Sequence, residues 1–336
     1  MLKPLLAALA LAGGALGAPA LAADAPAPKT ADAPESITWR VATPWPAASL
    51  HTETLLQFAR EVESASEGRL KVEVKPDASL KSPAVKRAVQ RNAAQLGDVA
   101  LAELQSEWPG FGLDSLPFLA RGHEPARRLY QAQRVPLGKQ LSGQGVVMLY
   151  SIPSPPVGLA LKQPAADLPA LRGLAWGTWS PAGERMAKLV GAKPVALPEA
   201  QAARALHGGQ LQAALVPAEA LAGGTSAEGG GVFLDLQAWA PRHGVLMNVK
   251  AFEALDKSLR KVVVKAALAA EKRGWEQSEA RHRRALARLK DVGVEVAEPP
   301  EALLTGLRKT VGEPFLDDWL QRAGAPGRLM LDEYRR

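Results

Sequence analysis

A strand, a helix and a second strand follow one another early in the sequence, and this order constrains the fold more than any other feature. Residues 37–43 and 70–74 alternate between apolar and polar types, whereas residues 50–66 carry apolar side chains at helical spacing. Two strands joined through one helix are typical of a βαβ unit with parallel strands. The sequence therefore predicts an α/β fold with a largely parallel sheet.

A second strand-to-helix junction lies near the middle of the sequence. The apolar run 174–179 contains Trp176 and Trp179, and Ser180 followed by Pro181 then opens a helix-forming segment. Ser180 is predicted to be a helix cap rather than a nucleophile. Ligands of open α/β sheets bind at such junctions. The two tryptophans either offer a flat apolar surface to a solute or belong to the core, and the sequence leaves both open.

The first 36 residues are typical of a targeting signal followed by a linker, rather than of a folded domain. Residues 1–22 combine a basic start, a short apolar stretch and an Ala-Leu-Ala cleavage site, which is typical of a signal peptide. Residues 23–36 are rich in alanine and proline and are expected to form a linker. No later apolar stretch approaches the roughly 20 residues of a membrane span. We therefore expect an exported protein of the periplasm.

Composition argues against several classes of function. The formal net charge is +7, but basic and acidic residues are interspersed, so we expect a solvated surface and no nucleic-acid partner. The chain has no cysteine, which excludes thiol catalysis and disulfides. Its five histidines are far apart and match no zinc or hydrolase motif. We expect neither an enzyme nor a bound metal or cofactor.

Prolines mark a boundary between two lobes. The segment Ser151-Ile152-Pro153-Ser154-Pro155-Pro156 is a stiff crossing. The strand pattern at 243–249 is expected to return to the first lobe, and a long helical region covers 251–289. We predict lobe I from residues 37–154 plus about 241–280, and lobe II from 155–240 plus about 281–336.

The order of these elements resembles the extracytoplasmic solute-binding proteins of tripartite ATP-independent periplasmic (TRAP) transporters, a family of C4-dicarboxylate and sialic acid binders. Several short phrases carry the resemblance between residues 37 and 300. They are Phe58-Ala59-Arg60-Glu61-Val62, Gly68-Arg69-Leu70-Lys71-Val72, Leu116-Pro117-Phe118-Leu119, Asp167-Leu168 with Leu171-Arg172-Gly173-Leu174, Val190-Gly191-Ala192-Lys193-Pro194, Ala205-Leu206, and Asn248 with Phe252 and Leu255.

The resemblance implies a periplasmic binding protein fold: two α/β lobes joined by a hinge, and a long helix that braces both. It implies that a small solute is enclosed between the lobes and delivered to membrane permease subunits. Hinge closure of this kind is a population shift driven by contacts made only in the closed form. The alternative is an interaction or sensory protein on the same fold that no longer binds small solutes.

The chain departs from the family at the expected carboxylate site. The arginine that clamps the ligand carboxylate in relatives aligns with Gly177, so this clamp is expected to be vacant. A second common arginine aligns with Val157, and a polar pocket residue aligns with Val216. Because a planar guanidinium matches a carboxylate, these losses argue against the usual dicarboxylate substrate.

Other side chains are candidates for the cleft. A carboxylate and indoles would suit an aromatic or cationic solute, whereas Arg242 offers a relocated clamp for an atypical acid. Both remain open. The predicted ligand-binding set is Glu103, Trp45, Trp176, Gly177, Trp179, Val216, Trp239 and Arg242.

Overall fold

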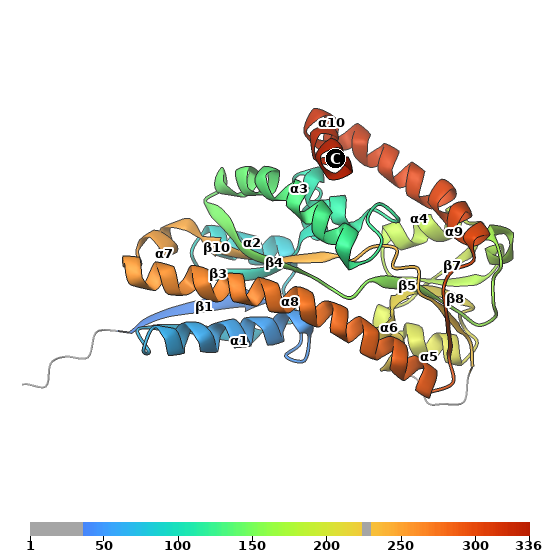
Figure 1. Ribbon diagram of the computed structural model, residues 1–336, viewed down its shortest axis with the longest axis horizontal. Coiled ribbons are helices and arrows are strands. Elements are labelled where there is room, and N and C mark those ends of the chain that lie inside the picture. Colours follow the sequence, from blue (N-terminus) through green and yellow to red (C-terminus); the bar gives the residue numbers. More distant parts are fainter. Residues whose placement is uncertain (1–35, 224–229) are drawn as a thin grey trace, which may run out of the picture. The chain divides into compact units, whose positions relative to one another are not determined.

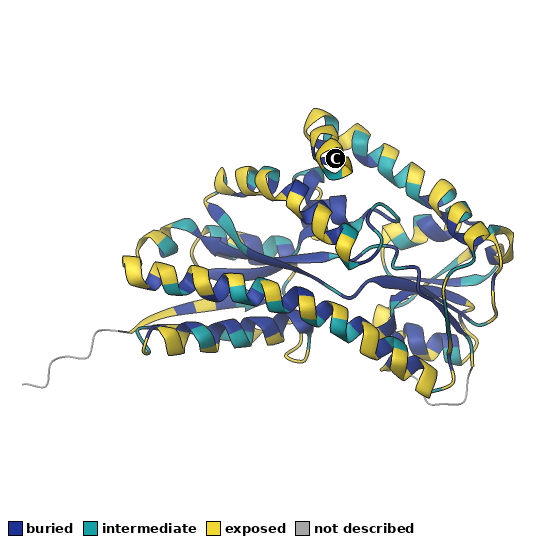
Figure 2. Cartoon of the chain, in the orientation of Figure 1, coloured by how far each residue is buried: buried dark blue, intermediate teal, exposed yellow. Residues whose placement is uncertain are grey.

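Two β-sheets form the frame of the protein in the computed structural model, which describes residues 36–223 and 230–336 (Figure 1). The predicted signal peptide and nearly all of the predicted linker lie outside these residues. Buried side chains follow the sheets and the inward faces of the helices, and the outward helix faces are exposed (Figure 2). Lobe I denotes the first sheet with the helices that pack on it, and lobe II denotes the second.

The first sheet contains the predicted strand–helix–strand unit. Its strand order is β2-β1-β3-β10-β4. The strands are β1 (Ile37–Thr43), β2 (Leu70–Pro76), β3 (Leu96–Ala100), β4 (Val146–Pro153) and β10 (Arg242–Asn248). β1 runs parallel to β2 and β3, but β10 enters antiparallel between β3 and β4. The sheet is therefore mixed, because a strand from late in the chain returns to its centre.

The second sheet has the order β11-β9-β5-β8-β6-β7. Its strands are β5 (Val157–Leu161), β6 (Ala175–Thr178), β7 (Lys193–Ala196), β8 (Ala213–Pro217), β9 (Val232–Leu234) and β11 (Glu295–Ala297). β6 is parallel to its neighbours β7 and β8, and β5 is antiparallel to β8 and β9. The junction after β6 has the predicted form, since the Gly183 amide donates to the Ser180 hydroxyl at the start of α4.

Helices cover both sheets. They are α1 (Leu50–Ala65), α2 (Ser82–Gln90), α3 (His123–Ser142), α4 (Pro181–Leu189), α5 (Ala202–His207), α6 (Ala218–Ala222), α7 (Val249–Glu253), α8 (Lys257–Asp291), α9 (Glu301–Leu307) and α10 (Glu313–Arg335). Short helical turns lie at η1 (Leu101–Leu104), η2 (Pro109–Ser115), η3 (Leu168–Leu171), η4 (Glu199–Gln201) and η5 (Arg308–Gly312).

Helix α8 is the predicted bracing helix. Its 35 residues span about 52 Å at the usual rise per residue. Leu259, Val263 and Trp275 join the core of lobe I, whereas Ala285 and Leu289 join a core of lobe II. The predicted helix over 251–289 is in fact two helices, because Asp256 accepts hydrogen bonds from the amides that start α8.

The two crossings between the sheets lie side by side. The Ser154 amide donates to the Pro241 carbonyl, and the Val157 amide donates to the Trp239 carbonyl. The segment 154–156 therefore runs along the segment that returns to β10. The predicted domain bounds stay a prediction, but α10 differs from them: the Trp319 side chain on α10 packs in one core with Leu113 and Leu129 of lobe I.

Candidate functional site

A groove lies between elements of the two lobes. It encloses about 560 Å³ and is bordered by η1 and η2 from lobe I, by the start of α4 from lobe II, and by α10. We call it the interlobe groove. Its polar and aromatic lining consists of Glu103, Gln105, Ser115, Ser180, Arg185, Trp239, Phe315 and Arg322.

The groove brings together charges of both signs. The Glu103 carboxylate accepts a hydrogen bond from the Ser82 amide, 3.1 Å away at the start of α2. Arg185 pairs with Asp318 and stacks over the Phe315 ring. Arg322 adds a second guanidinium from α10. The amino end of α4, whose amides carry a partial positive charge, lies at the same edge. The groove can therefore hold a small solute with one carboxylate and one hydrogen-bond donor.

Two of the predicted ligand-binding residues, Glu103 and Trp239, line this groove. Glu103 lies in a short helical turn beyond its strand. β3 stops at Ala100, and the chain turns into η1 because Leu101 and Leu104 are drawn into the core beneath. A short helical turn thus sets the position of Glu103 at the groove.

Three other predicted residues of lobe II lie in its cores. Trp176 is 1% exposed and packs with Val157 and Leu215, so of the two open interpretations the structure places it in the core. Val216 is buried in a second apolar core, against which Trp179 packs. None of the three lines the interlobe groove as the described residues define it.

Apolar side chains fill the space beside Gly177, the position where the family resemblance places an arginine. A Cβ atom added to Gly177 would lie 2.6 Å from Leu211 Cδ1 and 3.3 Å from Leu197 Cδ2. The two leucines fill the space beside the glycine, since interiors pack to the density of organic crystals. The strand position that aligns with the family's arginine is therefore part of an apolar core.

Arg242, the candidate for a relocated clamp, lies inside lobe I. It begins β10 and is 1% exposed. Its Nε atom lies 3.3 Å from Asp114, its Nη2 atom donates to Gln133, and its guanidinium lies 4.5 Å from the Tyr130 ring centroid. These contacts hold the guanidinium within the core of one lobe, so it is a structural cation there.

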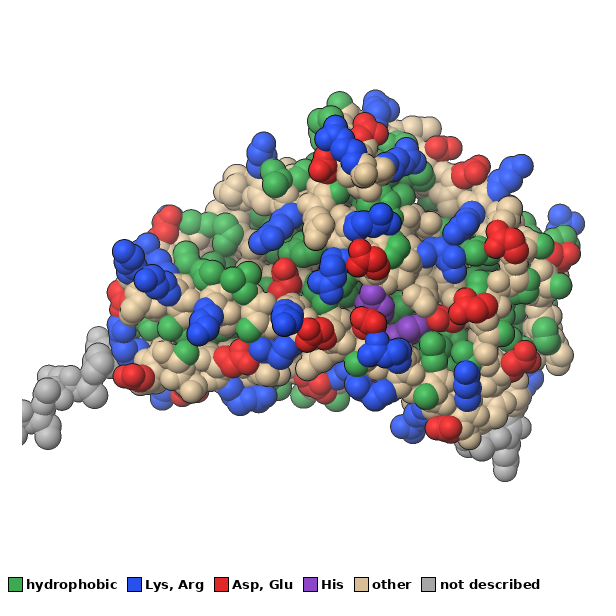
Figure 3. All heavy atoms as spheres, viewed as in Figure 1, with side chains coloured by type: hydrophobic (Ala, Val, Ile, Leu, Met, Phe, Trp, Pro, Cys, Tyr) green, Lys and Arg blue, Asp and Glu red, His purple; other side chains and the backbone are tan. Residues whose placement is uncertain are grey.

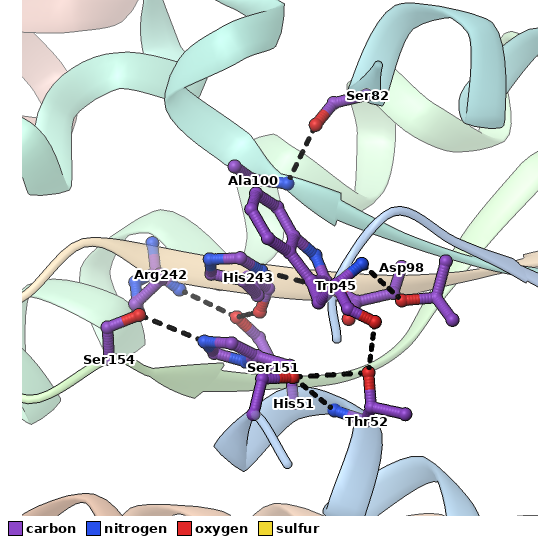
Figure 4. A network of polar contacts seen from close by, with 12 residues as sticks. Trp45, His51, Thr52, Ser82, Asp98, Ala100, Ser151, Ser154, Arg242 and His243 are labelled. Atoms are coloured by element: carbon purple, nitrogen blue, oxygen red, sulfur yellow. Dashed lines mark hydrogen bonds and ion pairs between the residues drawn. The ribbon is translucent and has the colours of Figure 1, made fainter. Parts of the chain in front are cut away.

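A buried polar cluster, absent from the predicted set except for Trp45, lies at the carboxyl edge of the first sheet (Figure 4). It consists of Trp45 after β1, His51 in the first turn of α1, Asp98 on β3 and His243 on β10. The two imidazoles stack with centroids 3.5 Å apart, and the Trp45 ring meets His243 edge-on at 4.7 Å. Register explains the meeting, because His243 pairs with Ala100, two residues beyond Asp98.

Several polar atoms of this cluster have no hydrogen-bond partner in the structure. They are Trp45 Nε1, His51 Nδ1, His243 Nδ1 and both Asp98 carboxylate oxygens. Burial, followed by the neighbouring His243 and Arg281, holds the pKa of His51 well below its usual value. One sequence signal pointed here: Asp98 is a carboxylate inside the otherwise apolar strand Leu-Gly-Asp-Val-Ala.

The surface carries no single dominant charge on the face shown in Figure 3, where basic and acidic side chains are interspersed. Among the described residues, none of the helices combines the length and apolar character that a membrane span requires.

Two α/β lobes that share a long helix and enclose a groove define a two-lobe solute-binding protein. A family model described as bacterial extracellular solute-binding protein, family 7, matches residues 41–317. The chain belongs to this family. It is accordingly a TRAP-type extracytoplasmic receptor for small solutes, located in the periplasm, and its family consists of receptors rather than enzymes.

Solved structures support the assignment. The chain is 39% identical to DctP6, a Bordetella pertussis extracytoplasmic solute receptor binding pyroglutamic acid, with a TM-score of 0.78 over 89% of this chain and 99% of that one. It is 33% identical to DctP7 of the same organism, also described as binding pyroglutamic acid, with a TM-score of 0.78 over 90% and 100% of the chains.

A TRAP solute-binding protein from a marine metagenome, specific for pyroglutamate, is 27% identical, with a TM-score of 0.76 over 90% of this chain and 99% of that one. No match was found among proteins with curated descriptions.

Proposed function

We propose that this receptor binds a small cyclic acid of the pyroglutamate type in the interlobe groove and delivers it to TRAP membrane permease subunits without chemical change. The observation that carries the proposal is the 39% identity to a receptor described as binding pyroglutamic acid, which the alignment covers over 99% of its length. Such an acid belongs to the third predicted solute class, the atypical acids. It is neither a cation nor a dicarboxylate.

The chemistry of the groove supports this choice. A lactam acid offers one carboxylate, one N–H donor and a small flat ring. Arg322 and the amino end of α4 are suited to the carboxylate. Glu103 is suited to accept the lactam N–H, and Trp239 supplies a flat apolar surface for the ring.

The experiment is calorimetric titration of the purified protein, prepared without refolding, with pyroglutamate. Proline, glutamate, orotate and glucuronate serve as comparisons. We expect saturable binding of pyroglutamate, and a higher melting temperature at saturation because the solute binds only the folded state. Glucuronate and glutamate should bind more weakly, since each places a second polar group against Phe315 or Trp239.

Matched variants locate the site. Arg322→Gln and Glu103→Gln should each weaken pyroglutamate binding by about tenfold or more, since a hydrogen bond to a charged group contributes roughly 1.5–3 kcal/mol. Arg328→Gln changes an exposed arginine of α10 beyond the kink at Gly324 and should bind as the wild type does. If no solute in the panel shifts the melting temperature, the interaction or sensory alternative gains support, because Gly177 and Val216 stand where the family resemblance places polar anchors.

A further inference from the structure

We propose that His51, Asp98 and His243 form a binding site for one divalent transition-metal cation of the zinc type on lobe I. The three side chains come from α1, β3 and β10, and no sequence spacing links them. One ligand atom from each lies within 4.8 Å of the others. The site is separate from the interlobe groove, and its existence does not depend on the identity of the solute.

The carboxylate of Asp98, which is buried and accepts no hydrogen bond, is the strongest argument for a cation. The residue is 1% exposed, and neither carboxylate oxygen accepts a hydrogen bond. Among the described residues it lies within ion-pair distance of His243, whose Nδ1 atom is 3.4 Å from Oδ1. A buried carboxylate without hydrogen bonds is costly, and buried charges in proteins are normally hydrogen-bonded in pairs or coordinate metals. A divalent cation between the carboxylate and the two imidazoles would neutralise it.

The donor set selects the kind of metal. Two imidazole nitrogens with one carboxylate oxygen suit zinc and the neighbouring divalent ions cobalt and nickel, whereas calcium and magnesium prefer oxygen ligands throughout. His51 is also oriented for this role. Its Nε2 atom bonds to the Ser154 hydroxyl at 2.9 Å, which leaves the Nδ1 atom without a hydrogen-bond partner and free to bind a metal.

The geometry requires a small rearrangement on binding. In a tetrahedral zinc site, neighbouring ligand atoms lie about 3.4 Å apart, so atoms within 4.8 Å must approach one another by up to about 1.4 Å. The stacked rings of His51 and His243, now inclined by 12°, must tilt so that both lone pairs meet one ion. Three protein ligands leave a fourth position for water.

The test is a titration of chelator-treated, tag-free protein with Co²⁺, followed by displacement with Zn²⁺. We expect one equivalent of Co²⁺ to produce the visible absorption bands of a low-coordinate ion, and one equivalent of Zn²⁺ to abolish them. His51→Gln and His243→Gln should each weaken binding at least about tenfold. His207→Gln, which changes a histidine at the end of α5 in lobe II, should bind like the wild type.

Asp98→Asn distinguishes a metal ligand from a structural carboxylate. It should lose the metal while raising the melting temperature of the metal-free protein, because it removes a buried carboxylate that accepts no hydrogen bond. If Asp98→Asn does not fold, the histidine variants carry the test, with folding checked by circular dichroism. Absence of saturable Co²⁺ binding to wild type, or equal binding by both histidine variants, overturns the proposal. Because no solute is added, these outcomes are independent of pyroglutamate binding.

Discussion

Gly177 lies directly against Leu211: a Cβ atom on the glycine would come within 2.6 Å of the leucine Cδ1. Gly177 occupies strand β6 and pairs with Ala214 of β8, so its backbone is fixed by neighbouring strands on both sides. The close approach leaves no room for a longer side chain unless Leu211 moves. The smallest residue is therefore required by packing.

Enlarging this position should destabilise the protein. We expect Gly177→Ala to lower the free energy of unfolding by about 1–3 kcal/mol, the usual cost of overpacking a core. Gly177→Arg should be worse and should not create a carboxylate clamp. Denaturant unfolding measures both. Gly138→Ala is the control, since a Cβ on this α3 glycine meets no atom within 4 Å; it should stabilise by about 0.5–1 kcal/mol.

Removing the buried guanidinium of Arg242 should lower the free energy of unfolding more than enlarging Gly177 does. Arg242→Met leaves Asp114 buried beside an apolar side chain, which should lower the free energy of unfolding by about 3–5 kcal/mol. Denaturant unfolding of Arg283→Met supplies the comparison. Arg283 pairs with Glu279 on the exposed face of α8, so its loss should change stability by less than about 0.5 kcal/mol.

The Arg242→Met variant also separates a structural role of Arg242 from a role in solute binding. At a temperature where Arg242→Met is folded, its affinity for pyroglutamate should stay within about threefold of the wild type. A loss of solute binding without a loss of stability would contradict the structural role and restore the interpretation of a relocated clamp.

Protonation of His123 should weaken the fold in mild acid. Burial, together with the neighbouring His282, lowers the pKa of His123 to about 4 from an ordinary value of 6.5. Glu279 opposes this shift, whereas Arg127 and Arg283 add to it. The unfolded chain therefore binds more protons between these two values, and stability must fall as the pH drops from about 6.5 to about 4.

The check is the free energy of unfolding of wild type and His123→Gln across this window. The glutamine amide can replace the bond of His123 Nε2 to the Ser278 hydroxyl, 3.1 Å away, without titrating. The wild type should lose more stability than the variant between pH 6.5 and pH 4, and the two should run in parallel above pH 7. Identical slopes throughout would exclude His123 as the titrating group.

Arg281 connects the two lobes through charge. It lies on α8 and reaches Glu53 on α1 at 2.5 Å and Glu219 on α6 at 3.1 Å. Arg281→Gln should lower the free energy of unfolding by about 1 kcal/mol in dilute buffer and by less in 1 M salt, because salt screens half-exposed pairs. Arg284→Gln, on the exposed face of the same helix, should show no such salt dependence. Equal effects of the two variants would mean that the bridge contributes nothing measurable.

The architecture was predictable from local patterns. The alternation at 37–43, the helical spacing at 50–66 and the Ser-Pro start at Ser180 each depend on residues close in sequence, and each element is present. The prolines at 155 and 156 likewise lie between the two sheets. These features could be predicted because the periodicity of a strand or a helix can be recognised within a single segment of the sequence.

The site was harder to predict because it depends on register. No local sequence pattern predicts that β10 pairs with β3, and this pairing is what brings His243 close to Asp98. Trp176, Val216 and Arg242 illustrate the same limit. Each lies on a strand of the structure, but whether its side chain faces solute or core depends on residues far along the chain, such as Leu215 for Trp176 and Asp114 for Arg242.

The shared helix α8 has a consequence for how the protein comes apart. Its first half is covered by lobe I and its second half by lobe II, and Gly274 sits so close to Ile152 that the helix cannot shift along β4 without a clash. Unfolding of either lobe removes the side chains that cover one half of α8 and exposes the apolar surface of that half. The lobes are thus thermodynamically coupled, and a heat-capacity trace should contain one peak rather than two.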